Sequence, residues 1–181
     1  MNYRIERIPQ EPLSADKVKL AVAVAATLYF LWAALHPDSW RLIDGVNLVI
    51  HEAGHVVFSP FGQFLAVAGG SLFQVIVPVV FAGYFYFSRK PYSCALVLFW
   101  AGESLLNVSV YAADSIAMQL PLLGGDNSIH DWNFMLDRLG LLHQTARIAF
   151  ALRALGTLLI ISAALWAILT ALRPAKSEFE R

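Results

Sequence analysis

Two histidines and a glutamate stand close together in an apolar stretch, in the segment His51-Glu52-Ala53-Gly54-His55. Residues four positions apart lie on the same face of an α-helix, so this spacing brings the two imidazoles to one point. Two imidazoles placed in this way can bind one Zn²⁺, and the intervening glutamate can act as general base toward a zinc-bound water. The motif therefore predicts a zinc site with His51 and His55 as metal ligands and Glu52 as the catalytic residue.

A catalytic zinc ion needs a third protein ligand and keeps a fourth position for water. Four residues that follow the motif are candidates, namely Asp114 in an apolar stretch and Asp126, His130 and Asp131 in a polar loop. His130 is the first choice because of its ligand type, with Asp131 beside it as a ligand or as a hydrogen-bond acceptor for one. Asp131 also precedes an amphipathic segment at 131–142, so the alternative is that it caps this helix.

A second set of polar residues recurs with helical spacing in the apolar stretch 92–119. Glu103, Asn107, Tyr111 and Asp114 stand at offsets of 0, 4, 8 and 11, which places them within about 80° of one another around a helix. A membrane helix turns such a polar face toward protein or water. We expect this polar stripe beside the zinc site, as groups that support ligands, polarise substrate or carry protons. A hydrogen-bond network that only joins helices is the alternative.

The composition indicates that membrane helices position these residues. Hydrophobic residues make up 58% of the 181 residues and charged residues only 14%, against roughly half and a quarter in average globular proteins. Four stretches are long and apolar enough to cross a bilayer, which takes about 20 helical residues: 18–35, 68–87, 92–119 and 146–171. The motif lies in a further helical segment, 42–58. We expect an all-α, polytopic membrane helical bundle of four to five transmembrane helices, with the motif helix inserted in the bundle.

Charge and turn residues outline the organisation of the chain. Polar tails at 1–17 and 173–181 flank one membrane-embedded domain at 18–172, which has no internal repeat. The basic residues of both tails and of the Arg89-Lys90 turn would face the cytoplasm if four helices cross and the motif helix dips in and returns. A fully crossing motif helix would give five spans and put the C-terminus outside. We prefer the first topology, for a multi-pass protein of the inner or plasma membrane.

The remaining features narrow the class of partner. The 13 basic and 13 acidic residues cancel, and no long basic run occurs, so the bilayer is an expected partner and nucleic acid is not. The single Cys94 cannot form an internal disulfide.

Ionisable groups at membrane depth cost about 2.5 kcal/mol or more each and are functional as a rule. This cost favours a metal site over a hydrogen-bonded cluster or an interfacial patch at the motif. The small pair Gly69-Gly70 indicates close helix packing.

The motif in this setting resembles a known family. A His-Glu-x-x-His sequence from His51 to His55 in an apolar helix, a Gly-rich apolar span and a later Asp-containing loop are similar to the site-2 protease class of intramembrane zinc metalloproteases. More narrowly, they are similar to peptidase M50B-like membrane proteins. The resemblance covers residues 42–131. It implies Zn²⁺ bound by His51 and His55, Glu52 as general base, and hydrolysis of a peptide bond near or in the membrane.

The resemblance also bears on the third ligand. Members of the class take it from an aspartate in an Asn-Pro…Asp-Gly motif on a later transmembrane segment, and this chain has no clean copy. The run from Leu120 to Asp126 is loosely similar to that motif, and this similarity favours Asp126 over His130 as the third ligand. The chain has no room for the PDZ domain that many members carry.

The leading hypothesis is a membrane-embedded zinc endopeptidase that hydrolyses peptide bonds of membrane or membrane-proximal substrates. Two alternatives stay open: a zinc amidohydrolase that acts on a lipid, and a non-proteolytic zinc-binding or metal-transporting membrane protein. A transporter would show a polar track across the bilayer and internal repeats. A structural protein should tolerate Glu52→Gln, whereas an enzyme should lose turnover and keep its metal.

Overall fold

The computed structural model describes residues 16–123 and 129–173. Its helices are α1 (Lys17–Leu35), α2 (Leu42–Phe58), α3 (Gln63–Phe87), α4 (Pro91–Ala113), α5 (Asp131–Arg138) and α6 (Thr145–Leu172), with short 3₁₀ turns at Ser59–Phe61 and Leu142–Gln144. No strand occurs in the described part of the chain. The predicted all-α bundle is confirmed.

Four helices are long and apolar enough to cross a membrane: α1, α3, α4, and α6 together with the turn before it. The expected third span is too long, because α4 ends at Ala113 and the chain turns over residues 114–119. The Asp114 carboxylate accepts the N–H groups of Gln119 and Leu120 at 3.0 and 2.9 Å, and these bonds stabilise the turn. The motif helix α2 is not among the candidate spans. The chain therefore has the helices of a multi-pass membrane protein.

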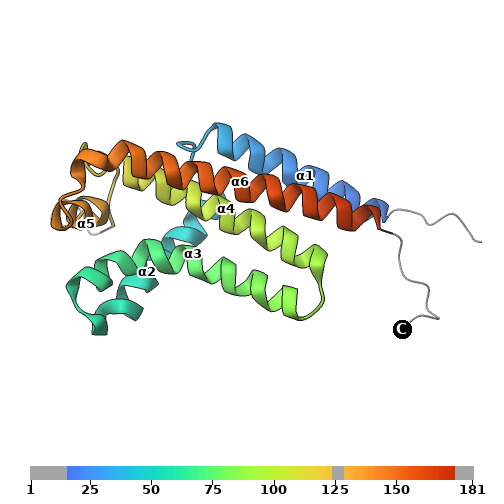
Figure 1. Cartoon of the computed structure of the whole chain (residues 1–181), viewed down its shortest axis with the longest axis horizontal. Helices are drawn as coiled ribbons and strands as arrows, with labels where there is room; N and C mark the ends of the chain where they lie inside the picture. The colour runs from blue at the N-terminus through green and yellow to red at the C-terminus, as the bar shows by residue number, and fades with distance from the viewer. Residues whose placement is uncertain (1–15, 124–128, 174–181) are drawn as a thin grey trace, which may run out of the picture.

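The long helices run side by side along the long axis of the molecule (Figure 1). α4 and α6 form the central pair, α1 packs on α6, α3 packs on α4, and α2 packs on α3. Small residues let the central pair approach closely, since a Cβ added at Gly102 would lie 2.9 Å from the Gly156 carbonyl oxygen. Buried Phe99, Leu106 and Ile160 fill the space around this contact.

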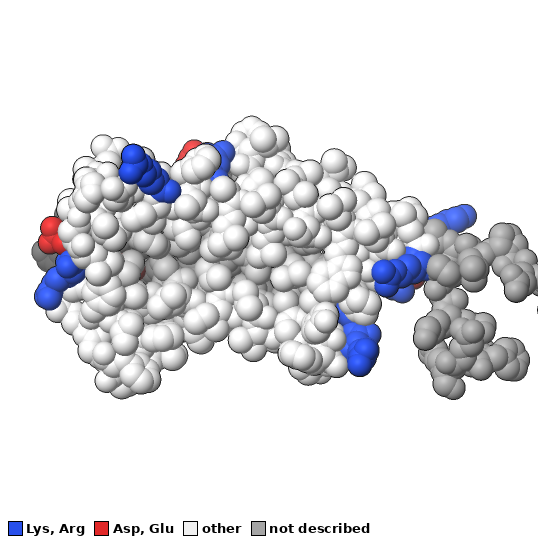
Figure 2. Space-filling model, in the orientation of Figure 1, with Lys and Arg blue, Asp and Glu red and all other residues white. Residues whose placement is uncertain are grey.

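The two ends of the bundle contain different elements. The start of α1, the α3–α4 turn and the end of α6 share one end (Figure 1), where the Asp16 N–H donates to the Ala171 carbonyl over 3.2 Å. This end carries Lys17, Arg89 and Arg173. On the face drawn in Figure 2, charged side chains gather toward the two ends and leave an uncharged zone between them. Helices α2 and α5 lie at the opposite end. This arrangement fits the topology in which four helices cross.

Glycines bring the motif helix α2 onto α3. Gly54 lies within the motif, and a Cβ added at Gly69 of α3 would come 2.6 Å from the Gly54 carbonyl oxygen. Gly70 lies against the imidazole of His51, where a Cβ would come 2.5 Å from Nε2. The expectation of close helix packing at Gly69-Gly70 is confirmed. The packing also explains the small residue inside the motif, because a side chain at position 54 would push the helices apart.

Candidate metal centre

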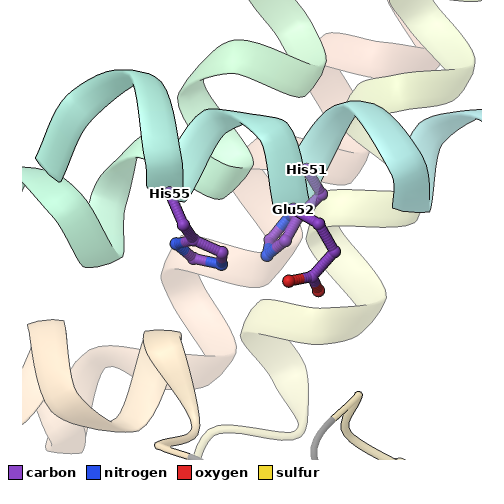
Figure 3. A group of neighbouring side chains, drawn as sticks. All are labelled: His51, Glu52 and His55. Atoms are coloured by element: carbon purple, nitrogen blue, oxygen red, sulfur yellow. The ribbon is translucent and has the colours of Figure 1, made fainter.

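The three motif side chains extend from one side of α2 (Figure 3). One possible ligand atom from each of His51, Glu52 and His55 lies within 4.8 Å of the others, and the two imidazole centroids are 4.8 Å apart. His51 is buried, His55 is half-buried and Glu52 is exposed. The helical spacing thus brings the imidazoles together, as predicted, and leaves the glutamate accessible to a substrate.

Asp131 presents one carboxylate oxygen to both imidazoles. Its Oδ2 lies 2.9 Å from His51 Nε2 and 3.3 Å from His55 Nε2. Two ligands that each lie about 2.0–2.1 Å from a tetrahedral zinc ion are about 3.3 Å apart. Both separations from the carboxylate oxygen are therefore close to those between two ligands of one zinc ion.

The second nitrogen of each imidazole faces an oxygen atom. His55 Nδ1 lies 2.8 Å from the Ala66 carbonyl oxygen, and His51 Nδ1 lies 3.3 Å from Gln74 Oε1. A carbonyl oxygen can only accept, so both Nδ1 atoms carry hydrogen and donate it. Metal-binding histidines usually have such an acceptor behind them, because it leaves Nε2 as the metal ligand.

The contacts with Asp131 shift the pKa values of these groups. The hydrogen bond to Asp131 raises the pKa of His55 to about 9, against the opposing effect of burial. Burial acts to raise the pKa of the Asp131 carboxyl, but the bonds to both histidines outweigh it, so the pKa is lowered. The charges thus favour a cation where the three atoms meet, either a proton on His55 or a metal ion that displaces it.

Neighbouring helices hold Asp131 in place at the first residue of α5. Its backbone N–H donates to the Tyr111 hydroxyl of α4 at 3.1 Å. The next residue, Trp132, donates from Nε1 to Ser71 Oγ of α3 at 3.1 Å. The start of α5 is therefore fixed against both helices that border the site.

His130, the first choice for the third ligand, lies beside the histidine pair and is not brought to it. Its Nδ1 accepts the Asn133 N–H at 3.3 Å, which makes it the N-cap of α5. Its Nε2 lies 3.3 Å from Asp114 Oδ2. Both ring nitrogens are therefore engaged away from the motif. The capping role considered for Asp131 belongs to its neighbour.

Of the two other candidates for the third ligand, only Asp114 lies in the described part of the chain, and its carboxylate bonds are made away from the motif histidines. Asp114 lies at the C-terminal end of α4 and not within it, and its carboxylate holds the turn described above. Asp126 falls outside the described residues. Among the described candidates, only Asp131 contacts both His51 and His55.

The polar stripe of α4 faces protein, as expected. Glu103 is fully buried and accepts from Asn47 Nδ2 at 2.6 Å. Asn107 donates to Asp44 Oδ1 at 3.0 Å and accepts from Gln74 Nε2 at 2.8 Å. The stripe thus forms a hydrogen-bonded network between helices, and through Gln74 this network reaches the motif.

The Tyr111 ring is the member of the stripe nearest the histidines. Its centroid lies 5.7 Å from that of His51 and 4.5 Å from that of His130. Its hydroxyl accepts the Asp131 N–H, which leaves the hydroxyl proton free to donate to another acceptor.

The sequence analysis did not predict Arg41, Asp44, Asn47 and Gln74 as members of this network. A signal for two of them was present. Asp44, Asn47 and His51 are spaced by three and four residues, so they share one face of α2 with the motif. All three are buried. A polar stripe on an exposed helix face would have the same spacing, so the sequence alone did not show that these residues are buried.

Two cavities meet at the motif. One, of about 210 Å³, extends toward Leu48, Val108 and Pro121. The other, of about 340 Å³, extends toward Gln63, Val67 and Ile129. The residues that line both are His51, Glu52, Tyr111, Leu122 and Leu123. Space for a ligand is therefore present on both sides of Glu52.

Comparisons with protein-family models, with curated proteins and with solved structures found no match for this chain. The geometry of the site is therefore what indicates a function.

Proposed function

We propose that this chain is a membrane-embedded zinc-dependent endopeptidase, with His51, His55 and Asp131 as zinc ligands and Glu52 as general base. One observation carries the proposal. Asp131 Oδ2 lies 2.9 and 3.3 Å from the Nε2 atoms of the two motif histidines, while both Nδ1 atoms face acceptors. The donor set of two imidazoles and one carboxylate suits zinc, with a fourth position for water.

The side chains around the site have separate tasks in the proposed reaction. A bound zinc ion would polarise the scissile carbonyl and lower the pKa of a water molecule. Glu52, which is exposed, accepts a proton from that water and returns it to the leaving amine. Tyr111 lines both cavities, and its hydroxyl proton can stabilise the negative charge that develops on the carbonyl oxygen.

The cavities support an extended apolar peptide as the substrate. They continue on either side of Glu52, and their walls include Leu48, Val67 and Val108. A peptide bond placed over Glu52 would then have flanking residues in both cavities. Since the site belongs to a membrane protein, we expect substrates that lie in or beside the bilayer.

The test is hydrolysis by the purified protein in lipid vesicles, with a mixture of synthetic peptides from membrane segments and mass spectrometry of the products. We expect new peptide termini that depend on zinc. Glu52→Gln should lower the rate by at least about 10²-fold and should leave the zinc content unchanged. Hydrolysis of lipid amides with intact peptides would instead favour the amidohydrolase. No hydrolysis by the zinc-loaded protein would favour a non-proteolytic zinc protein.

A further inference from the structure

A chain of hydrogen bonds runs from His51 away from the proposed zinc site. His51 Nδ1 lies 3.3 Å from Gln74 Oε1, and Gln74 Nε2 lies 2.8 Å from Asn107 Oδ1. Asn107 Nδ2 in turn lies 3.0 Å from Asp44 Oδ1. Helices α2, α3 and α4 all contribute to this chain. Gln74 and Asp44 are each only 2% exposed.

Arg41 fixes the far end of the chain. Its backbone N–H donates to Asp44 Oδ2 at 2.6 Å. Its Nε lies 3.2 Å from the same oxygen, near enough for an ion pair but at an angle too poor for a hydrogen bond. The guanidinium also donates to the carbonyls of His36 and Pro37 at 3.2 and 3.3 Å. The cation is thus anchored at the end of α1 and holds the Asp44 carboxylate in place.

The carboxylate sets the direction of every bond in the chain. It can only accept, so Asn107 turns its NH₂ group to Asp44 and its carbonyl to Gln74. Gln74 then turns its NH₂ group to Asn107 and its carbonyl to His51. The Ser104 carbonyl, 3.5 Å from Gln74 Nε2, favours the same orientation. His51 must therefore donate from Nδ1.

We propose that Arg41, Asp44, Asn107 and Gln74 are positioning residues that keep hydrogen on Nδ1 of His51 and so reserve Nε2 for the metal. With hydrogen fixed on Nδ1, Nε2, which faces Asp131 at 2.9 Å, is the nitrogen that can give up a proton and bind a metal ion. The inference rests on the proposed function in that His51 is taken as a zinc ligand. Partners behind a metal-binding histidine typically change metal affinity by about 10–100-fold.

The two motif histidines differ in their need for such a device. His55 donates to the Ala66 backbone carbonyl, which has no alternative orientation. His51 faces a side-chain amide, which presents a donor if it turns over. The chain of bonds to Asp44 removes this ambiguity, and His55 serves as an internal control.

The test compares Asp44→Asn with Glu103→Gln as a matched control. Glu103 also pairs with Arg41, at 3.4 Å, but its carboxylate accepts from Asn47 and not from Asn107 or Gln74. In Asp44→Asn, Arg41 retains the amide oxygen and the new NH₂ group faces Asn107, which favours reversal of the chain. We expect zinc affinity to fall by about 10–100-fold, with Glu103→Gln close to wild type.

Nitrogen-15 NMR of the metal-free protein gives the decisive readout. We expect Nδ1 of His51 to carry hydrogen in wild type and Glu103→Gln and to lose it in Asp44→Asn, while His55 is unchanged. Equal Nδ1 signals in all three proteins would overturn the proposal. If Asp44→Asn does not fold, Gln74→Met removes the acceptor directly and is judged by the same signal. A wild type that binds no zinc would refute the proposed function, whereas the Nδ1 signal would still decide whether the chain of hydrogen bonds orients His51.

Discussion

At the scale of the residue, the site depends on which nitrogen of each imidazole carries hydrogen. Both motif histidines present Nε2 to Asp131 and direct Nδ1 to an oxygen atom behind the ring. A metal ion at the proposed site would therefore compete with a proton for the position beside Asp131. This competition would make metal binding dependent on pH.

The competition predicts how His55 titrates in the metal-free protein. Its pKa should be about 9, well above the ordinary value, and should fall in Asp131→Asn because the hydrogen bond to the carboxylate and the carboxylate charge are lost. Below this pKa, zinc must displace a proton, so zinc affinity should rise about tenfold per pH unit and level off above it. Proton NMR of the imidazole and chelator competition across this pH range test both statements. A His55 that titrates at its ordinary pKa in the wild type would contradict them.

The sequence predicted part of this residue-level detail. The spacing of His51 and His55 was sufficient to place two imidazoles together, since helical geometry alone decides that. The choice between His130 and Asp131 was not predictable, because it depends on the residue at which α5 begins. His130 caps this helix with Nδ1, and the cap turns Asp131, the next residue, toward the motif.

At the scale of the element, the site depends on how closely α2 packs on α3. Gly54 and Gly69 allow this approach, and Gly70 leaves room for the His51 ring. The sequence predicted the close packing but not its partner, because Gly-rich helix faces pack against any suitable neighbour. The early end of α4 was also missed, since an apolar run does not reveal the turn that Asp114 stabilises.

Gly70→Ala should disturb the site through this packing. The new Cβ would lie 2.5 Å from His51 Nε2, so the ring must move, and we expect zinc affinity to fall by at least about tenfold, the effect of a misplaced ligand. Gly83→Ala is the matched control on the same helix, because a Cβ there meets nothing within 4 Å. It should stabilise α3 by up to about 1 kcal/mol and keep zinc binding intact. Equal zinc affinity in the two variants, measured by chelator competition, would show that Gly70 is not needed for the site.

At the scale of the whole molecule, four candidate spans place the motif at one end of a bundle and the basic turn at the other. Apolar length and composition were enough to predict this architecture, because the bilayer imposes both. The path of α2 was less predictable, since a helix of 17 residues with four ionisable groups fits neither a full span nor a surface loop.

The arrangement predicts that the α3–α4 turn and α5 lie on opposite sides of the membrane. In a Cys94→Ala background, single cysteines at Lys90 and Arg138 can be probed with an impermeant maleimide in intact cells. Both positions are exposed. By the positive-inside rule, Arg138→Cys should react from outside and Lys90→Cys only after permeabilisation. Labelling of both from the same side would require a different number of crossings.

The central claim is that His51, His55 and Asp131 bind one zinc ion. The most direct measurement is zinc content per chain in purified wild type, His51→Ala, Asp131→Ala and His130→Ala, with helix content checked by circular dichroism. We expect about one zinc ion per chain in the wild type, loss of zinc in His51→Ala and Asp131→Ala, and retention in His130→Ala, where only a helix cap worth about 1 kcal/mol is removed. Zinc that is absent from the wild type, or that persists in Asp131→Ala, would contradict the claim.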